Sequence, residues 1–262
     1  MITLSEDTRV ALARELQQAR ATRTALRHFS SRFPGMTIED GYAIQREWVK
    51  LELAAGRTIR GRKIGLTSRA MQMASNFNEP DYGYLTDDML LSDGAQIEVS
   101  RYISPRLEVE LGFVMGQDLQ GAGCTVADVM RATEFIMPSL ELIAYRTHVP
   151  RAIVDTIADN AAAGAMITGG RLVRPFDVDI RWIGATLSKN GVIEESGVSA
   201  AVMGHPAAGI AWLVNKLARH GVGLKAGQLV LAGPFTRPIT VAAGDVVQAD
   251  YGPLGTLGVR FV

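Results

Sequence analysis

The segment PRLEVELGF, residues 105–113, places two acids inside what otherwise has the pattern of a core strand. Apolar residues alternate along it with polar or small ones, and a period of two is the signal of a β-strand. Glu108 and Glu110 therefore lie on the same face of the expected strand. Residues two apart on a strand are separated by about 6.5 to 7 Å, so both carboxylates can reach one cation between them.

A third acid lies in another apolar segment. Glu141 belongs to IMPSLELI, residues 136–143, and has apolar neighbours on both sides. An ionised carboxylate there requires a cation, a basic partner or a proton. One Mg²⁺ or Mn²⁺ held by the three glutamates meets that requirement, since oxygen ligands with no His or Cys nearby favour hard cations. The alternative is an ordinary strand with its glutamates in solvent, and the residues alone leave both interpretations open.

The composition argues against several classes of function. The chain has 262 residues, with 27 Lys+Arg against 27 Asp+Glu, so it has no general attraction to nucleic acid or to an anionic membrane. No apolar run approaches the roughly 20 residues that cross a bilayer, and the acidic N-terminus is unlike a signal peptide. The single cysteine, Cys124, excludes an intrachain disulfide. We therefore expect a cytoplasmic protein that acts on a small molecule.

The order of the expected elements predicts the fold class. Amphipathic helices are expected over residues 4–26 and 37–55, the second with Thr37 and Asp40 as its start signal. Glycine-punctuated short strands follow, including a hairpin at Asn190-Gly191 and four strands in the last forty residues. We predict an α+β protein built on a rolled mixed β-sheet. A small N-terminal helical subdomain would occupy residues 1–58 and the catalytic domain residues 59–262.

Three further segments are candidates for the functional site, and each also has a purely structural interpretation. Lys63 is followed closely by a glycine that lets a ligand approach, but a lysine on an edge strand is more often solvated. Residues 79–88 have the Pro, Gly and Asp content of a loop, and their acids can be simple surface. Asp159-Asn160 is favoured as a turn or helix cap over a polar pair in a pocket. No dinucleotide-binding fingerprint, P-loop or nucleophile elbow is present.

The motifs in combination resemble a known family. They are KIGLTS (63–68), EPDYG (79–83), DDM (87–89), VEL (109–111), GHP (204–206) and VRF (259–261). Over nearly the whole chain they resemble the 2-hydroxypenta-2,4-dienoate hydratase and 4-oxalocrotonate decarboxylase branch of the fumarylacetoacetate hydrolase-like superfamily. Within it, TIEDGYAIQREW (37–48) and FTRP (235–238) look most like the 2-oxohept-4-ene-1,7-dioate hydratases. The short connection between Tyr145 and Asp155 is closer in length to the decarboxylases.

The resemblance implies a fold, a cofactor and a reaction. The fold would be fumarylacetoacetate hydrolase-like, and Mg²⁺ (or Mn²⁺) would be held by Glu108, Glu110 and Glu141. The enzyme would add water to a 2-hydroxy-2,4-dienoate of the 2-oxohept-4-ene-1,7-dioate type, giving a 4-hydroxy-2-oxo acid in aromatic meta-cleavage catabolism. The resemblance further implies catalytic roles for Lys63, Asp81 and Asp159, and substrate binding by Lys63, Tyr82, Asn160 and Thr236.

Two other functions remain open at this point. The same enolate chemistry serves a 4-oxalocrotonate (2-oxo-3-hexenedioate) decarboxylase, in which no water adds. A non-catalytic partner subunit is a further alternative, because hydratase and decarboxylase of this branch associate. The resemblance also implies a homo-oligomer and association with the companion enzyme, but no nucleic-acid or membrane partner.

Overall fold

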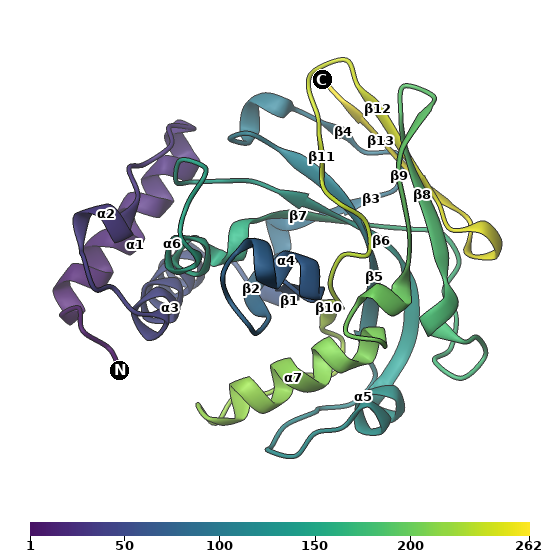
Figure 1. The fold of residues 1–262 in the computed structure, drawn as a ribbon, viewed down its shortest axis with the longest axis horizontal. Coiled ribbons are helices and arrows are strands. Elements are labelled where there is room, and N and C mark those ends of the chain that lie inside the picture. Colours follow the sequence, from purple (N-terminus) through teal and green to yellow (C-terminus); the bar gives the residue numbers. More distant parts are fainter.

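The computed structural model describes all residues 1–262, and a helical layer lies on one side of two β-sheets (Figure 1). The layer contains α1 (Glu6–Thr22), α2 (Phe29–Arg32), α3 (Ile38–Ala54) and the later α6 (Ile153–Ala158). Both expected long helices are confirmed, and α3 begins with the capping box of Thr37 and Asp40. Because α6 packs with α3, the layer includes residues from beyond position 58. The division of the chain into two domains stays a prediction.

The larger sheet has eight strands and carries the acidic segments. Its order is β2-β1-β10-β5-β6-β7-β3, and β11 pairs with β5. The β1–β10 and β3–β7 pairs are parallel and the others antiparallel. The strands are β1 (Ile59–Gly65), β2 (Asp81–Thr86), β3 (Leu90–Ser92), β5 (Arg106–Met115), β6 (Thr133–Ile143), β7 (Ala163–Thr168), β10 (Leu229–Leu231) and β11 (Ile239–Thr240).

The second sheet has five strands in the order β4-β13-β12-β8-β9. They are β4 (Gln96–Ile97), β8 (Gly184–Lys189), β9 (Val192–Val198), β12 (Val246–Asp250) and β13 (Thr256–Phe261). The predicted hairpin is confirmed, and Asn190 and Gly191 both have the positive φ that its turn needs. The α+β class with mixed sheets is confirmed as well, and the strands form two open sheets.

The prediction of a loop over residues 79–88 is wrong for most of that segment. Residues Asp81–Thr86 form β2, which pairs along its length with β1. Burial of all six residues outweighs the weak strand propensity of Asp and Gly, because the strand lies between β1 and the buried segment around Asn160. Side chains therefore alternate along β2, which separates Asp81 from Tyr82.

Three further helices lie outside the helical layer. They are α4 (Arg69–Ala74), α5 (Val126–Ala132) and α7 (Pro206–Ala218), and α7 packs with α5 and β1. Pro206 is the first residue of α7, and the Ala207 N–H donates to Nδ1 of His205, which caps the helix. None of the helices has both the length and the apolar character needed to cross a membrane.

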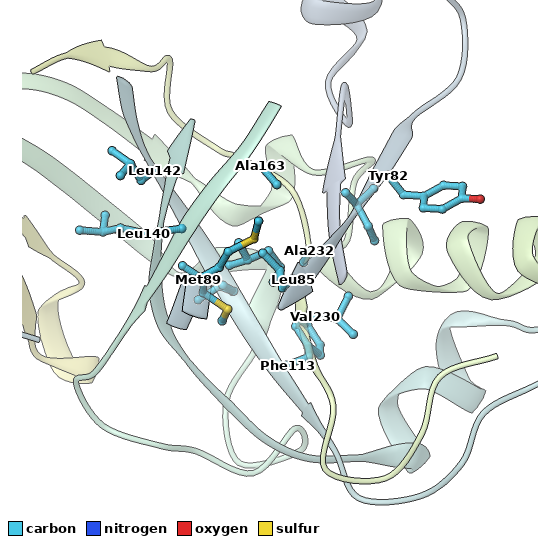
Figure 2. Packing of buried hydrophobic residues seen from close by; sticks show 14 of the residues in the cluster. Tyr82, Leu85, Met89, Phe113, Leu140, Leu142, Ala163, Val230 and Ala232 are labelled. Atoms are coloured by element: carbon cyan, nitrogen blue, oxygen red, sulfur yellow. The ribbon is translucent and has the colours of Figure 1, made fainter. Parts of the chain in front are cut away.

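The core lies between the strands of the large sheet and the elements packed on it. Leu85, Met89 and Val230 meet in its centre, whereas the ring of Tyr82 points away from them (Figure 2). Phe113 of β5 is fully buried in the same cluster. The buried apolar surroundings of β5 and β6 are what make an acid on these strands costly.

Candidate active site

Three acids converge on the two central strands of the large sheet. The β5–β6 register sets Glu108 directly opposite Glu141, with Glu110 two residues further along β5. All three are buried, and one carboxylate oxygen from each lies within 4.8 Å of the others. Oε2 of Glu110 accepts a hydrogen bond of 2.7 Å from the Gly233 N–H. Oε1 of Glu110 and both oxygens of Glu141 accept no hydrogen bond, and Oε1 of Glu141 forms an ion pair with Lys63.

The electrostatics of this acid trio are unfavourable without a cation. Burial raises the pKa of all three carboxyl groups. The charge of Glu141 raises the pKa of Glu108 and of Glu110 further. Three buried carboxylates, two of which have oxygens that accept no hydrogen bond, form a hard-oxygen donor set, the type that Mg²⁺ and Mn²⁺ prefer. The residues present therefore fit a divalent cation.

Lys63 and Asp81 lie beside the trio. Nζ of Lys63 is 3.3 Å from Oε1 of Glu141. The lysine is buried and lies on an interior strand, so it is not a solvated residue at a sheet edge. The register of β1 and β2 pairs Gly65 with Asp81. A side chain at Gly65 would collide with Oδ1 of Asp81 and come within 3.1 Å of Nζ of Lys63. The missing side chain of Gly65 thus makes room for both groups.

The protonation of these two groups follows from their neighbours. Burial alone would lower the pKa of Lys63, but the surrounding carboxylates, Glu141 foremost, raise it above its ordinary value. Lys63 is therefore charged. Burial raises the pKa of Asp81, against the opposing charges of Lys63 and Arg151. Oδ1 of Asp81 is buried and has no hydrogen-bond partner, so it is available to a bound molecule.

Thr236 lies in the segment that follows β10 and runs along β5. The Val109 N–H donates to Oγ1 of Thr236 at 3.1 Å, and the Phe235 N–H donates to the Val109 carbonyl. This segment also supplies the Gly233 N–H to the acid trio. Sequence reasoning missed Gly233, although a glycine two residues after a buried strand is a signal of close backbone approach.

Tyr82 and Asn160 make structural contacts in this structure. The ring of Tyr82 stacks on Tyr42 with centroids 4.6 Å apart, on the opposite face of β2 from Asp81. Oδ1 of Asn160 accepts from the Tyr84 N–H at 2.8 Å, and its Nδ2 donates to the Tyr84 carbonyl at 2.9 Å. Substrate binding by these two residues stays a prediction.

Asp159 is surrounded by arginines. Arg146 and Arg151 both form ion pairs with its buried carboxylate, and the Arg146 backbone N–H donates to it at 2.8 Å. A catalytic role for Asp159 stays a prediction, and its contacts hold the two arginines in place. Arg151, which sequence reasoning did not single out, is buried and has an Nη2 without any acceptor.

Comparison with known proteins places the chain in a family. Residues 55–262 match the family described as fumarylacetoacetate (FAA) hydrolase C-terminal. The chain belongs to the fumarylacetoacetate hydrolase family. Within this family it is 51% identical to 2-oxo-hept-4-ene-1,7-dioate hydratase of Escherichia coli, over 97% of this chain and 98% of the relative. It is 35% identical to 4-oxalocrotonate decarboxylase of Pseudomonas sp. (strain CF600), over 99% of each chain.

A solved structure of the same family matches the whole fold. It is 4-oxalocrotonate decarboxylase from Pseudomonas putida G7 complexed with magnesium and adipate, with a TM-score of 0.98, 35% identity and full coverage of both chains. The relatives are hydratases and decarboxylases, both of which are lyases. This member of the fumarylacetoacetate hydrolase family is accordingly an enzyme of the lyase type.

Proposed function

We propose that this enzyme is a divalent-metal-dependent hydratase acting on a 2-hydroxy-2,4-dienoate of the 2-oxohept-4-ene-1,7-dioate type. Its product would be a 4-hydroxy-2-oxo acid, in aromatic meta-cleavage catabolism. The observation that carries the proposal is the buried acid trio with unpartnered oxygens, next to a charged lysine. The 51% identity to a hydratase over nearly the whole chain supports this reaction over the alternatives.

Glu108, Glu110 and Glu141 would hold Mg²⁺ or Mn²⁺ in this proposal. When bound, the cation supplies Lewis acidity for an α-keto acid. The chain itself fixes the position of one ligand through the main chain, because the Gly233 N–H donates to Oε2 of Glu110. The apolar strands around the trio exclude bulk water, which strengthens every charge interaction within it.

Lys63 and Asp81 are the proposed proton carriers. Ketonisation moves the proton of the 2-hydroxyl group to the far carbon of the diene and leaves an alkene conjugated with the 2-oxo group. Water then adds its oxygen at C4 and a proton at C3. Nζ of Lys63 can donate to oxygen as negative charge develops there, and Oδ1 of Asp81, with its raised pKa, is suited to exchange a proton with water.

The decarboxylase remains the second candidate, since a decarboxylase shares the whole fold at a TM-score of 0.98. A product assay separates the two reactions. The purified chain with Mg²⁺ is offered 2-hydroxyhepta-2,4-diene-1,7-dioate and, separately, 4-oxalocrotonate. We expect a hydrated product from the first and no CO₂ from the second. Release of CO₂ without any hydrated product would overturn the hydratase, and turnover of neither would favour the partner subunit.

We also propose that the enzyme forms a homo-oligomer and associates with its companion decarboxylase. The support is the family resemblance of the chain together with the high similarity to both activities. Size-exclusion chromatography with light scattering measures the first, and co-purification with a 4-oxalocrotonate decarboxylase from the same pathway measures the second. A monomer at micromolar concentration would contradict the oligomer.

A further inference from the structure

Arg151 is a buried arginine with hydrogen-bond donors to spare. Its side chain is 4% exposed. Nε donates to Oγ1 of Thr156 at 3.0 Å, and Nη1 donates to Oγ1 of Thr147 at 2.6 Å and to Asp159. Nη2 has no acceptor although it is buried. Unsatisfied buried donors are costly, so the fold keeps two N–H groups for an acceptor that the chain itself does not supply.

Arg151 and Arg106 share an aromatic neighbour, Tyr145. The Arg151 guanidinium carbon is 4.9 Å from the centroid of the Tyr145 ring, and that of Arg106 is 5.8 Å from the same centroid. Arg106 is on the same face of β5 as Glu108, one strand period away from it. Tyr145 is two residues beyond the end of β6, whose Glu141 faces Glu108. The two arginines thus border the end of the site where β5 begins and β6 ends.

Two arginines at one end of the site suit the second carboxylate of a dicarboxylate. An arginine presents parallel N–H donors that match the geometry of a carboxylate. Burial raises the pKa of Asp81 while the charges of Lys63 and Arg151 oppose it, which agrees with Arg151 lying close to the reacting groups.

Building on the proposed function, we propose that Arg151, with Arg106 beside it, binds the distal carboxylate of the substrate and selects dicarboxylic over monocarboxylic dienoates. The proximal carboxylate and 2-oxo group would lie at the acid trio. Nη2 of Arg151 would donate to the distal carboxylate, which satisfies the unpartnered nitrogen. Asp159 is then a positioning residue, because it orients the arginine that touches the substrate.

Arg146 provides a matched control. It is buried and pairs with the same Asp159, but Nη1 and Nη2 both donate to the Ala163 carbonyl, and Nη2 also donates to the Asp159 carbonyl. Its guanidinium has no free nitrogen. Replacing Arg146 therefore removes a buried charge and a partner of Asp159 without removing a donor available to substrate.

The first experiment compares Arg151→Met and Arg146→Met on two substrates. These are 2-hydroxyhepta-2,4-diene-1,7-dioate and 2-hydroxyhepta-2,4-dienoate, which lacks the distal carboxylate. We expect the ratio of kcat/KM values, dicarboxylate over monocarboxylate, to fall about 10- to 100-fold in Arg151→Met, as for loss of a charge-assisted hydrogen bond. In Arg146→Met the ratio should stay at the wild-type value. Equal losses on both substrates in Arg151→Met would overturn the proposal.

The second experiment measures binding without turnover. Calorimetry with the Mg²⁺-loaded protein gives the affinities for heptanedioate and heptanoate. We expect the wild type to prefer heptanedioate and Arg151→Met to lose that preference, and a wild type without preference would overturn the proposal. If the wild type turns over neither dienoate, the proposed hydratase fails while this measurement still tests the arginine. Should Arg151→Met not fold, Arg106→Met carries the same test with a smaller expected loss of preference.

Discussion

The large sheet and the helical layer both bury acids, but the two regions differ in whether the carboxylate oxygens have partners. On the sheet, three carboxylates face one another and leave oxygens without partners. In and beside the helical layer, the oxygens of equally buried acids are bound by hydrogen bonds or arginines. The acids of this second set are Asp40, Asp155 and Asp159.

Asp40 shows what a structural acid requires. It accepts hydrogen bonds from the Thr3 and Leu4 N–H groups, from the Thr3 hydroxyl and from Thr37. Burial raises the pKa of Asp40, but these bonds outweigh burial and hold the pKa well below its ordinary value. Burial of an acid therefore does not mark a functional site, whereas unpartnered oxygens beside other carboxylates do.

The largest expected effect is the loss of turnover when an acid of the large sheet is neutralised, as in Glu108→Gln. We expect turnover with Mg²⁺ to fall by more than about 100-fold, since changes to groups merely behind a metal ligand already cost about 10- to 100-fold. Because the substitution removes a repulsive buried charge, the free energy of unfolding of the metal-free protein should be equal or higher. Steady-state kinetics and urea unfolding in EDTA measure the two effects. Near-normal turnover would refute the three-acid site.

Metal removal should affect stability only through the acid trio. A cation that binds the folded state alone stabilises it by about 2.7 kcal/mol at a concentration 100 times its dissociation constant. We expect thermal or urea unfolding of the wild type to show a gain of this order with Mg²⁺, and Asp40→Asn to keep the gain. Glu108→Gln should lose most of it. An equal gain in all three proteins would place the metal elsewhere.

The converse effect is expected for Asp40→Asn. Loss of charged hydrogen bonds should lower the free energy of unfolding by about 1.5 to 3 kcal/mol. Turnover per folded molecule should remain near the wild-type value because Asp40 lies in the helical layer, at the start of α3. Urea unfolding at neutral pH and active-site-normalised kinetics test this pair of outcomes. A large loss of turnover in a fully folded variant would break the contrast between the two regions.

The smallest expected effect is the pH dependence of the stability that is lost in Asp40→Asn. The folded-state pKa of Asp40 is lowered, so its stabilising contribution is fully present above the unfolded pKa of about 4 and declines as pH falls toward the folded value. The stability difference between wild type and Asp40→Asn should be constant above about pH 5 and shrink below about pH 4. Unfolding curves at several pH values measure it, and a difference that grows toward acid pH would contradict the assignment.

The sequence predicts the acid trio because the local pattern carries it. Alternation places Glu108 and Glu110 on one face, and the apolar surroundings of Glu141 indicate a buried acid that requires a cation, a basic partner or a proton. The capping box of Thr37 and the Asn190-Gly191 hairpin are local patterns of the same kind. Each of these patterns depends on residues only a few positions apart, whereas the meeting of Glu141 with the other two acids depends on the pairing of β5 with β6.

The parts of the site that the sequence did not predict depend on contacts between residues that are far apart in the chain. Gly233 bonds to an acid 123 residues earlier in the chain, and no local pattern indicates that meeting. The free Nη2 of Arg151 is visible only once every other donor has been assigned a partner. The strand at Asp81–Thr86 was missed because Asp81 and Gly83, with Pro80 just before them, are typical of loops, and the pairing with β1 decided otherwise.

The bare α-carbon at Gly65 constrains how this enzyme can evolve. Alanine there would leave every reacting group in the chain, yet its methyl group would occupy the space of the Asp81 carboxylate and crowd the Lys63 ammonium. Activity would then be lost through geometry alone. The site therefore depends on a side chain that is missing at position 65 as well as on the side chains that are present.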